Sequence, residues 1–558
     1  MTKWWKKNWL VALILLLAFF LSLMVVVPSG LRYCKNTSCG VMFWGANEHD
    51  GIWHLAVSNT LFLRSPYETP NMSGQRLGGY NYLLDFLIAT TGRLTSINTS
   101  TLYFQILPVL WFSVFAFCTF RFARAYSKTK TYIYSLLFFG FFGSSLSYLL
   151  SLINRGTIWG SGGLLSMQSL QNLLNIQFSL SLIPFYLILT GLTEDKRNLQ
   201  DYLKYGIYLF VALGLKFYTG VGIAVYMATD LVVRIIKEKK LSLTIFTKNI
   251  LVAFFGVAAS LLFYLPTSLD GSPLIFKPFA TVNPLVEDSS LLYIPQIAQK
   301  IYDEQGIKLL ILEVFILFLY VVFNYGSRIF ALLGLINKEK GSVSRDTTIS
   351  VFVTSILLLL IAALFVQRGV WWNTVQFLYV SMFLTNILAA NGLDRLFRLG
   401  RRYGKLLGIG VILMTLPTNL DIVRSFAHFP GNSYIPDQEI AALRFLSGQE
   451  GGVVLADYLV TERSDKQLPT VREAYDTSYV AAYSGKQSFL NDLVQLDLMN
   501  TNYAERLKMV KTYDCTVLSL VSYVYELNNR PYIGNYEKCD KQLGEIFKNE
   551  MVTIYQTI

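Results

Sequence analysis

Long apolar stretches recur along residues 1–420, and their length predicts membrane-spanning helices. The hydrocarbon core of a bilayer is about 30 Å thick, so a helix needs about 20 mostly apolar residues to cross it. Residues 202–233 are too long for one span and carry Lys216 in their middle, which predicts two short helices in a tight hairpin around this lysine. A short glycine-containing segment at 403–416 completes a count of eleven spans. The other eight cover residues 8–27, 102–120, 131–150, 176–192, 250–265, 309–323, 348–366 and 371–390.

Residues 421–558 have a different pattern, in which helical periodicity alternates with short apolar runs. Helices are predicted at 437–446 and 503–511, and strands at 453–457, 516–521 and 551–556. This alternation favours a small mixed sheet covered by helices. The predicted fold is therefore mostly α: a polytopic membrane bundle of about eleven helices at 1–420, with a long first outer loop at 28–101, followed by an extracytoplasmic α/β domain at 421–558.

Composition and charge agree with this division and fix an orientation. The chain is 53% apolar and 15% charged, which excludes a disordered protein or a basic nucleic-acid-binding protein. Residues 1–420 hold 35 basic and 18 acidic residues, whereas residues 421–558 hold 13 basic and 18 acidic ones. With the N-terminus inside, the inner loops hold 24 Lys and Arg and the outer loops hold 10. We therefore expect a multi-pass cell-membrane protein with a cytoplasmic N-terminus, an uncleaved first segment and an extracytoplasmic C-terminal domain.

Candidate chemistry is concentrated just after the first span. Only three histidines exist in the chain, and two of them, His49 and His54, lie within seven residues of the acidic Glu48 and Asp50. Carboxylates one residue apart can face one site in a turn, and Asp50 could act as a general base. The alternative is a solvated acidic turn in which Asp50 caps the helix that follows.

This pattern resembles a known family. The Glu-x-Asp pair Glu48 and Asp50, in the first outer loop after a single N-terminal span, resembles the modified Asp-x-Asp motif of the GT-C membrane glycosyltransferases. The segment 214–220, with Lys216 at its centre, resembles the bacterial mannosyltransferase-like branch. The resemblance covers the architecture of residues 1–420. It implies inverting transfer of a hexosyl or pentosyl group from a polyprenyl phosphate-linked donor to an extracytoplasmic glycan, lipid or protein of the cell envelope. Asp50 would be the base and Glu48 would support it.

Six further side chains are candidates for substrate binding in that reaction. A departing lipid phosphate needs cationic partners, which Lys216 and Arg368 could supply. Their alternatives are snorkelling to the headgroups and interfacial anchoring. Amides in the glycine-rich outer loop 154–175 could bind sugar hydroxyls, or the loop could bind nothing. The candidates are Lys216, Arg368, His49, His54, Gln168 and Gln171.

The sequence also bears on cofactors, partners, disulfides and alternative functions. No metal ligand is assigned and no cofactor is required, although the family allows a divalent metal. Expected partners are the lipid-linked sugar donor, membrane lipids and the acceptor, and no nucleic acid. The four outer cysteines form two disulfides or remain free thiols: Cys34, Cys39, Cys515 and Cys539. The alternative functions are a transporter or flippase of lipid-linked saccharides and a non-catalytic envelope assembly protein. The absence of an internal repeat disfavours the transporter.

Overall fold

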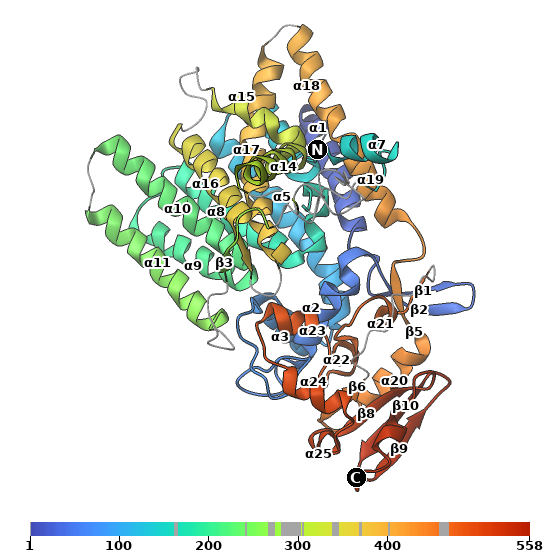
Figure 1. Cartoon of the computed structure of the whole chain (residues 1–558). Helices are drawn as coiled ribbons and strands as arrows, with labels where there is room; N and C mark the ends of the chain where they lie inside the picture. Colours follow the sequence, from blue (N-terminus) through green and yellow to red (C-terminus); the bar gives the residue numbers. More distant parts are fainter. Residues whose placement is uncertain are drawn as a thin grey trace. The chain divides into compact units, whose positions relative to one another are not determined.

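The computed structural model describes residues 2–160, 166–239, 243–265, 274–280, 303, 306–336, 345–367, 371–399, 402–456 and 468–558 (Figure 1). The chain forms two compact units. The first consists of Met1–Met24, Val109–Leu262 and Ser272–Ala427, and the second of Val25–Pro108, Phe263–Gly271 and His428–Ile558. The second unit therefore combines the predicted first outer loop with the C-terminal segment.

The first unit is a helical bundle. Its core contains α17 (Gln376–Arg398), which packs against α6, α15, α16 and α18 and has most of its side chains buried. Helix α9 packs against both α8 and α10. The helices are α1 (Thr2–Met24), α5 (Leu107–Tyr126), α6 (Lys130–Phe142), α7 (Ser147–Arg155), α8 (Ile176–Thr193), α9 (Leu199–Leu215), α10 (Phe217–Glu238), α11 (Leu243–Phe263), α14 (Ile307–Tyr325), α15 (Ala331–Leu335), α16 (Arg345–Leu364), α17, α18 (Arg402–Met414) and α19 (Leu416–Ala427). Short 3-10 helices, among them Ser169–Leu174 and Gly326–Phe330, and a small pairing of β3 (Leu274–Phe276) with β4 (Phe365–Gln367) complete the unit.

Eight helices of the described residues are long and apolar enough to cross a membrane, or nine when the pair α6 and α7, bent by 47°, is one span. All eleven predicted segments coincide with a helix or with this bent pair. Two of them are short: the apolar part of α1 is Trp9–Met24, and α9 has 17 residues. The predicted count of eleven spans is therefore not confirmed, although the helices are where hydropathy predicts them.

The predicted helix break at Lys216 is present. Lys216 has an extended backbone (φ −158°, ψ 118°) between the end of α9 and the start of α10. The two helices pack directly on each other, and a methyl group added to Gly220 would come within 2.4 Å of the Leu213 side chain. This glycine allows the helices to approach closely beside the break.

The second unit is built on two sheets. In the first, β1 (Leu31–Lys35) and β2 (Ser38–Phe43) form a hairpin, and β2 pairs antiparallel with β5 (Ser433–Pro436). The other sheet has the order β7-β6-β8-β10-β9, with parallel β7, β6 and β8 and antiparallel β10 and β9. Its strands are β6 (Val453–Ala456), β7 (Gln487–Ser488), β8 (Tyr523–Leu527), β9 (Leu543–Lys548) and β10 (Val552–Thr557). Helices α2 (Asp50–Thr60), α3 (Leu83–Thr95), α20 (Asp437–Ser447), α22 (Tyr479–Ser484), α23 (Leu493–Leu498), α24 (Ala504–Lys511) and α25 (Thr516–Leu520) belong to this unit.

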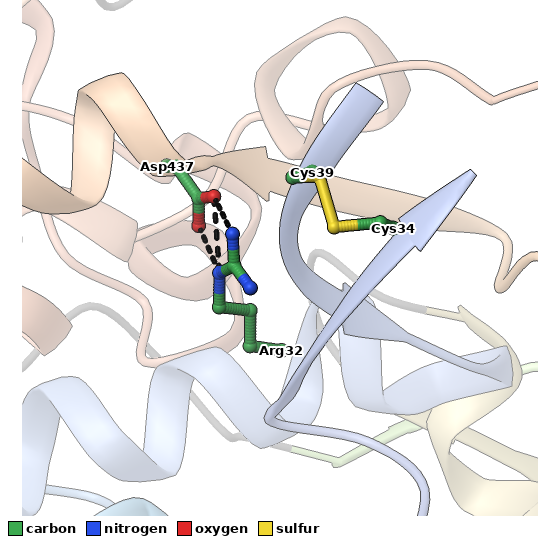
Figure 2. Close-up of a disulfide and its surroundings, with 4 residues drawn as sticks. All are labelled: Arg32, Cys34, Cys39 and Asp437. Carbon is green, nitrogen blue, oxygen red and sulfur yellow. Dashed lines mark hydrogen bonds and ion pairs between the residues drawn. A yellow bond between two sulfur atoms is a disulfide. The ribbon is translucent and has the colours of Figure 1, made fainter. Parts of the chain in front are cut away.

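Both cysteine pairs of this unit are disulfides. Cys34 and Cys39 face each other across the β1–β2 hairpin, and Cys515 is joined to Cys539. Figure 2 shows that Arg32 of the same hairpin forms an ion pair with Asp437 at the start of α20, with an Nη2–Oδ2 distance of 2.7 Å. The first-loop hairpin is therefore joined to the C-terminal segment by a strand pairing and an ion pair.

One prediction for the C-terminal segment is wrong. Residues 516–521 were expected to form a strand, but Thr516–Leu520 is the short helix α25, and the strand β8 begins at Tyr523. The Asp514 carboxylate accepts hydrogen bonds from the backbone N–H and the hydroxyl of Thr516, which starts a helical turn there. The other predicted helices and strands of this segment are present within one or two residues.

Candidate functional site

Asp50 stands at the start of a nearly completely buried helix of the second unit. It is the first residue of α2, whose positions from Gly51 to Ser58 are all buried. The Asp50 side chain, by contrast, is 50% exposed. A negative charge at a helix N-terminus is stabilised by the unpaired N–H groups and dipole of the helix. The carboxylate is therefore held at a fixed place where solvent or a substrate can reach it.

His49 joins this carboxylate to a second one that is far away along the chain. Its Nδ1 lies 3.1 Å from Asp50 Oδ1, and its Nε2 lies 3.3 Å from Asp492 Oδ1. The imidazole is only 15% exposed and the Asp492 side chain is fully buried. Burial opposes a charge on His49, but Asp492 and then Asp50 outweigh it and raise the pKa of His49 well above 6.5. The raised pKa favours the imidazolium form at neutral pH, and in this form the ring donates a hydrogen bond to each carboxylate.

Asp492 is held by residues of the C-terminal segment and of the first loop. Its Oδ2 accepts a hydrogen bond from the Ser478 hydroxyl at 2.8 Å, and its backbone carbonyl accepts one from the Asn71 amide at 3.0 Å. The Asp492 backbone N–H donates to Asp476 Oδ1 at 2.9 Å. Burial raises the pKa of Asp476 to about 7, and the neighbouring Asp492 carboxylate adds to this shift. The carboxyl groups of Asp50, Asp476 and Asp492 are thus close to one imidazole here.

His54 belongs to a second, buried cluster one helical turn further along α2. Its Nδ1 lies 3.0 Å from Asp85 Oδ1 and 3.2 Å from the Tyr80 hydroxyl. Burial raises the pKa of Tyr80 well above 10, and the charges of Asp85 and Asp50 contribute to this shift. Tyr80 is therefore close enough to Asp50 to feel its charge. His54 has a hydrogen-bonded place in the core of the unit, and its predicted contact with a substrate stays a prediction.

The remaining predicted residues have different surroundings. Glu48 ends the 3-10 helix Gly45–Glu48 and is buried, unlike Asp50. Lys216 is half-buried at the α9–α10 break of the first unit. Arg368 lies outside the described residues. The roles assigned to these side chains stay predictions.

Gln168 and Gln171 take part in the internal structure of the first unit. Gln168 is fully buried, and its Oε1 accepts a hydrogen bond from Arg328 Nη1 at 2.9 Å. The Gln171 side chain accepts a hydrogen bond from the Gln168 backbone N–H and caps a 3-10 helix. Arg328 also donates to Asn386 Oδ1 at 2.7 Å and to the Gly143 carbonyl at 2.8 Å. The amides of Gln168 and Asn386 therefore hold a buried guanidinium in place.

The partners of the two histidines are not predictable from the sequence. Asp492 and Asp476 come from residues more than 400 positions after His49, and no local pattern links them. Asp85 had a weak signal, as a carboxylate on the buried side of the amphipathic helix α3. Within the described part of the chain, no group of three or more His, Cys, Asp or Glu side chains is arranged to hold a metal ion.

Comparisons with known proteins find similarity in fold alone. No protein-family model matches the chain, and no curated protein sequence matches it. Among solved structures, the oligosaccharyltransferase of Archaeoglobus fulgidus with a tethered acceptor peptide is similar, with a TM-score of 0.51 and 12% identity over 94% of this chain and 70% of that one. The same archaeal enzyme in complex with zinc and sulfate has a TM-score of 0.50 and 12% identity over 92% of this chain and 68% of its own. The mycobacterial arabinofuranosyltransferase AftD has a TM-score of 0.52 and 12% identity over 99% of this chain, which spans 40% of its length.

The fold is that of the GT-C membrane glycosyltransferases. The resemblance found in the sequence is thus confirmed for the fold. The assignment to the mannosyltransferase-like branch is narrower and stays a prediction.

Proposed function

We propose that this protein is an integral membrane glycosyltransferase. It transfers a sugar from a polyprenyl phosphate-linked donor to an acceptor hydroxyl or amide outside the cytoplasm. The observation that carries the proposal is the half-exposed carboxylate of Asp50 at the N-terminus of a buried helix, hydrogen-bonded to the buried imidazole of His49. The GT-C fold supports it, because the archaeal and mycobacterial enzymes with this fold are glycosyltransferases by name.

The proposed reaction is an inverting displacement. The acceptor atom attacks the anomeric carbon while Asp50 takes its proton, so that a new glycosidic bond forms as the bond to the lipid phosphate breaks. The phosphate leaves with the bonding electron pair and its charge needs cationic partners, the role proposed for Lys216 and Arg368. The positive charge of His49 beside Asp50 favours the ionised carboxylate, which is the form that accepts a proton. No step in this scheme requires a metal ion.

Sugar transfer by the purified full-length chain tests the proposal. The protein would be placed in lipid nanodiscs with radiolabelled prenyl phosphate sugars of several types, and the label transferred to envelope extract would be counted. We expect Asp50→Asn to lower kcat by about 10²–10⁴-fold, the usual contribution of a positioned base. Asp540→Asn is the matched control, because Asp540 is an exposed carboxylate of the same unit. An Asp50→Asn variant within threefold of the unmodified chain would contradict the role of Asp50.

The same assay distinguishes the rival classes. A transporter or flippase of lipid-linked saccharides would move the labelled lipid across a sealed vesicle without forming a new glycosidic bond. An envelope assembly protein would do neither, and Asp50→Asn would then leave both readouts unchanged.

A further inference from the structure

We propose that Asp492, from the C-terminal segment, is a positioning residue of the candidate active site that fixes His49 and, through it, Asp50. The proposal deepens the proposed function and rests on it. The three side chains form one chain of hydrogen bonds, from Asp492 Oδ1 to His49 Nε2 at 3.3 Å and from His49 Nδ1 to Asp50 Oδ1 at 3.1 Å. Only the last of them, Asp50, is substantially exposed.

Asp492 is immobilised from several directions. Its carboxylate accepts hydrogen bonds from the Ser478 hydroxyl at 2.8 Å and from the backbone N–H of Gln495 at 3.4 Å, as the N-cap of α23. Its backbone N–H and carbonyl are bound by Asp476 and Asn71. A side chain held at this many points has little freedom, so it can impose an orientation on the imidazole that it contacts.

Electrostatic attraction to the surrounding carboxylates also holds the His49 imidazole in place. The ionisable groups that face His49 are Asp50 beside it, Asp492 and Asp476 from the C-terminal segment, and the Tyr475 ring, whose centroid is 6.0 Å away. Asp492 is completely buried, and a buried carboxylate is costly unless a cation accompanies it. The imidazolium supplies that cation, so its protonation and its position depend on each other.

The consequence for the reaction is geometric. With both ring N–H groups engaged, the His49 ring cannot rotate without breaking a charged hydrogen bond on each side. Asp50 is then held through one oxygen in a fixed direction. General-base catalysis is sensitive to such placement, because an error of about 1 Å can cost about 10²-fold in rate.

Histidine NMR tests the hydrogen-bonded chain without any enzyme assay. The chain has only three histidines, so ¹⁵N-histidine labelling of the full-length protein gives three pairs of ring-nitrogen signals, assigned by His→Gln variants. We expect the His49 signal of the unmodified protein to stay that of an imidazolium, with both ring nitrogens protonated, from pH 5 to pH 8. In Asp492→Asn it should titrate within this range. A His49 signal that titrates near pH 6.5 in the unmodified protein would overturn the proposal, whether or not any variant folds.

Kinetics then test the link to Asp50. We expect Asp492→Asn to lower kcat ten- to a hundredfold with little change in KM, and to introduce a step in kcat between pH 5.5 and 7.5 that the unmodified chain lacks. His49→Gln should lower kcat similarly, and the double variant should be no worse than the more damaged single one, since both act through one chain. Asp497→Asn is the control, because Asp497 is an exposed carboxylate on α23 five residues later. An unchanged pH profile in Asp492→Asn would refute the positioning role.

These outcomes separate the two proposals. If the NMR signature is present but Asp50→Asn keeps full transfer activity, the proposed function fails while the buried chain of hydrogen bonds stands. If Asp50→Asn is inactive but Asp492→Asn matches Asp497→Asn in both NMR and kinetics, the function stands and the positioning role is refuted.

Discussion

Gly392 of α17 offers a direct test of how the membrane bundle is packed. A methyl group added there would lie 2.1 Å from the backbone carbonyl oxygen of Phe330. The contact is reciprocal, because a methyl group on Gly334 would lie 2.2 Å from the Leu388 carbonyl oxygen. The Asn391 amide also donates to the Gly334 carbonyl at 2.7 Å. Backbone is in contact with backbone here, the close approach that small residues permit between membrane helices.

The cost of Gly392→Ala follows from this geometry. An ordinary carbon–oxygen contact is longer than the 2.1 Å available, so α15 and α17 would have to move apart. Overpacking of this kind costs about 1–3 kcal/mol. Replacing glycine by alanine inside a helix returns at most about 1 kcal/mol. We therefore expect a net loss of stability, and a larger one in the Gly334→Ala/Gly392→Ala double variant.

The matched control is Gly410→Ala in α18, where an added methyl group meets nothing within 4 Å. Only the helix-propensity gain should operate there. The assay is thermal unfolding in detergent, followed by the fraction of protein that remains monodisperse after heating. We expect Gly392→Ala to lose about 1 °C per kcal/mol relative to the unmodified chain, because the unit is large, and Gly410→Ala to lose nothing. Equal stability of the two variants would refute the close packing of α15 on α17.

Two further predictions concern charge. If Lys216 and Arg368 hold the departing phosphate, Lys216→Ala and Arg368→Ala should each lower kcat at least tenfold, about 1.4 kcal/mol, and Arg368→Lys should recover only part; a loss of thermal stability with unchanged kcat would indicate a headgroup anchor instead. Burial raises the pKa of Asp476 to about 7, above its value in the unfolded chain. The favourable contribution of Asp476 to the free energy of unfolding is therefore complete below about pH 3.8 and is lost as the pH rises through about 7. Hydrogen exchange of the Asp492 and Leu493 amides, which donate to Asp476, should therefore report weaker protection at pH 8 than at pH 6 after correction for intrinsic rates, and Asp476→Asn should remove this dependence. Equal protection at both pH values would contradict the shift.

Hydropathy predicted the helices of the first unit because long apolar runs have few alternatives in a membrane. The break at Lys216 was predictable for the same reason, since a cation amid apolar residues marks a place where a helix ends or turns. The strand predicted at 516–521 failed because a short apolar run has no periodicity that distinguishes strand from helix. There a local hydrogen bond from the Thr516 backbone N–H to the Asp514 carboxylate decided the outcome.

Arg328 illustrates what charge counting misses. Arg328 is one of the 24 basic residues that were counted on the inner side, in the segment 324–348, yet it is 1% exposed and is bound to neutral oxygens of Gln168, Asn386 and Gly143. Its partners come from three separate parts of the chain. A buried guanidinium of this kind is specified by tertiary contacts, which the spacing of charges along the sequence does not record.

The candidate site also contains residues that the sequence predicts and residues that it does not. Asp50 and His49 were predicted as site residues because they are neighbours in a chain with few histidines. Their position just after the first span also matches that of the acidic motif in the GT-C family. Asp492 is 443 residues away from His49 and belongs to a segment whose sequence carries no catalytic motif. The two segments meet within one unit because β2 pairs with β5 and Arg32 pairs with Asp437 (Figure 2). These contacts involve the hairpin that the Cys34–Cys39 disulfide closes. The conformation of the first loop and that of the C-terminal segment therefore depend on each other.

That dependence has a physical consequence for the role of the C-terminal segment. A carboxylate at a helix N-terminus could have been held by the helix alone, and Asp50 has such a helix in α2. The imidazolium beside it cannot be held so locally, because burial works against its charge and Asp492 is the largest contribution that opposes burial. Without residues 428–558, His49 would still contact Asp50. It would lose Asp492, the residue that contributes most to its protonation. The C-terminal segment therefore supplies the largest contribution that favours protonation of the residue next to the proposed base, and it does so from within the compact unit that contains the first loop.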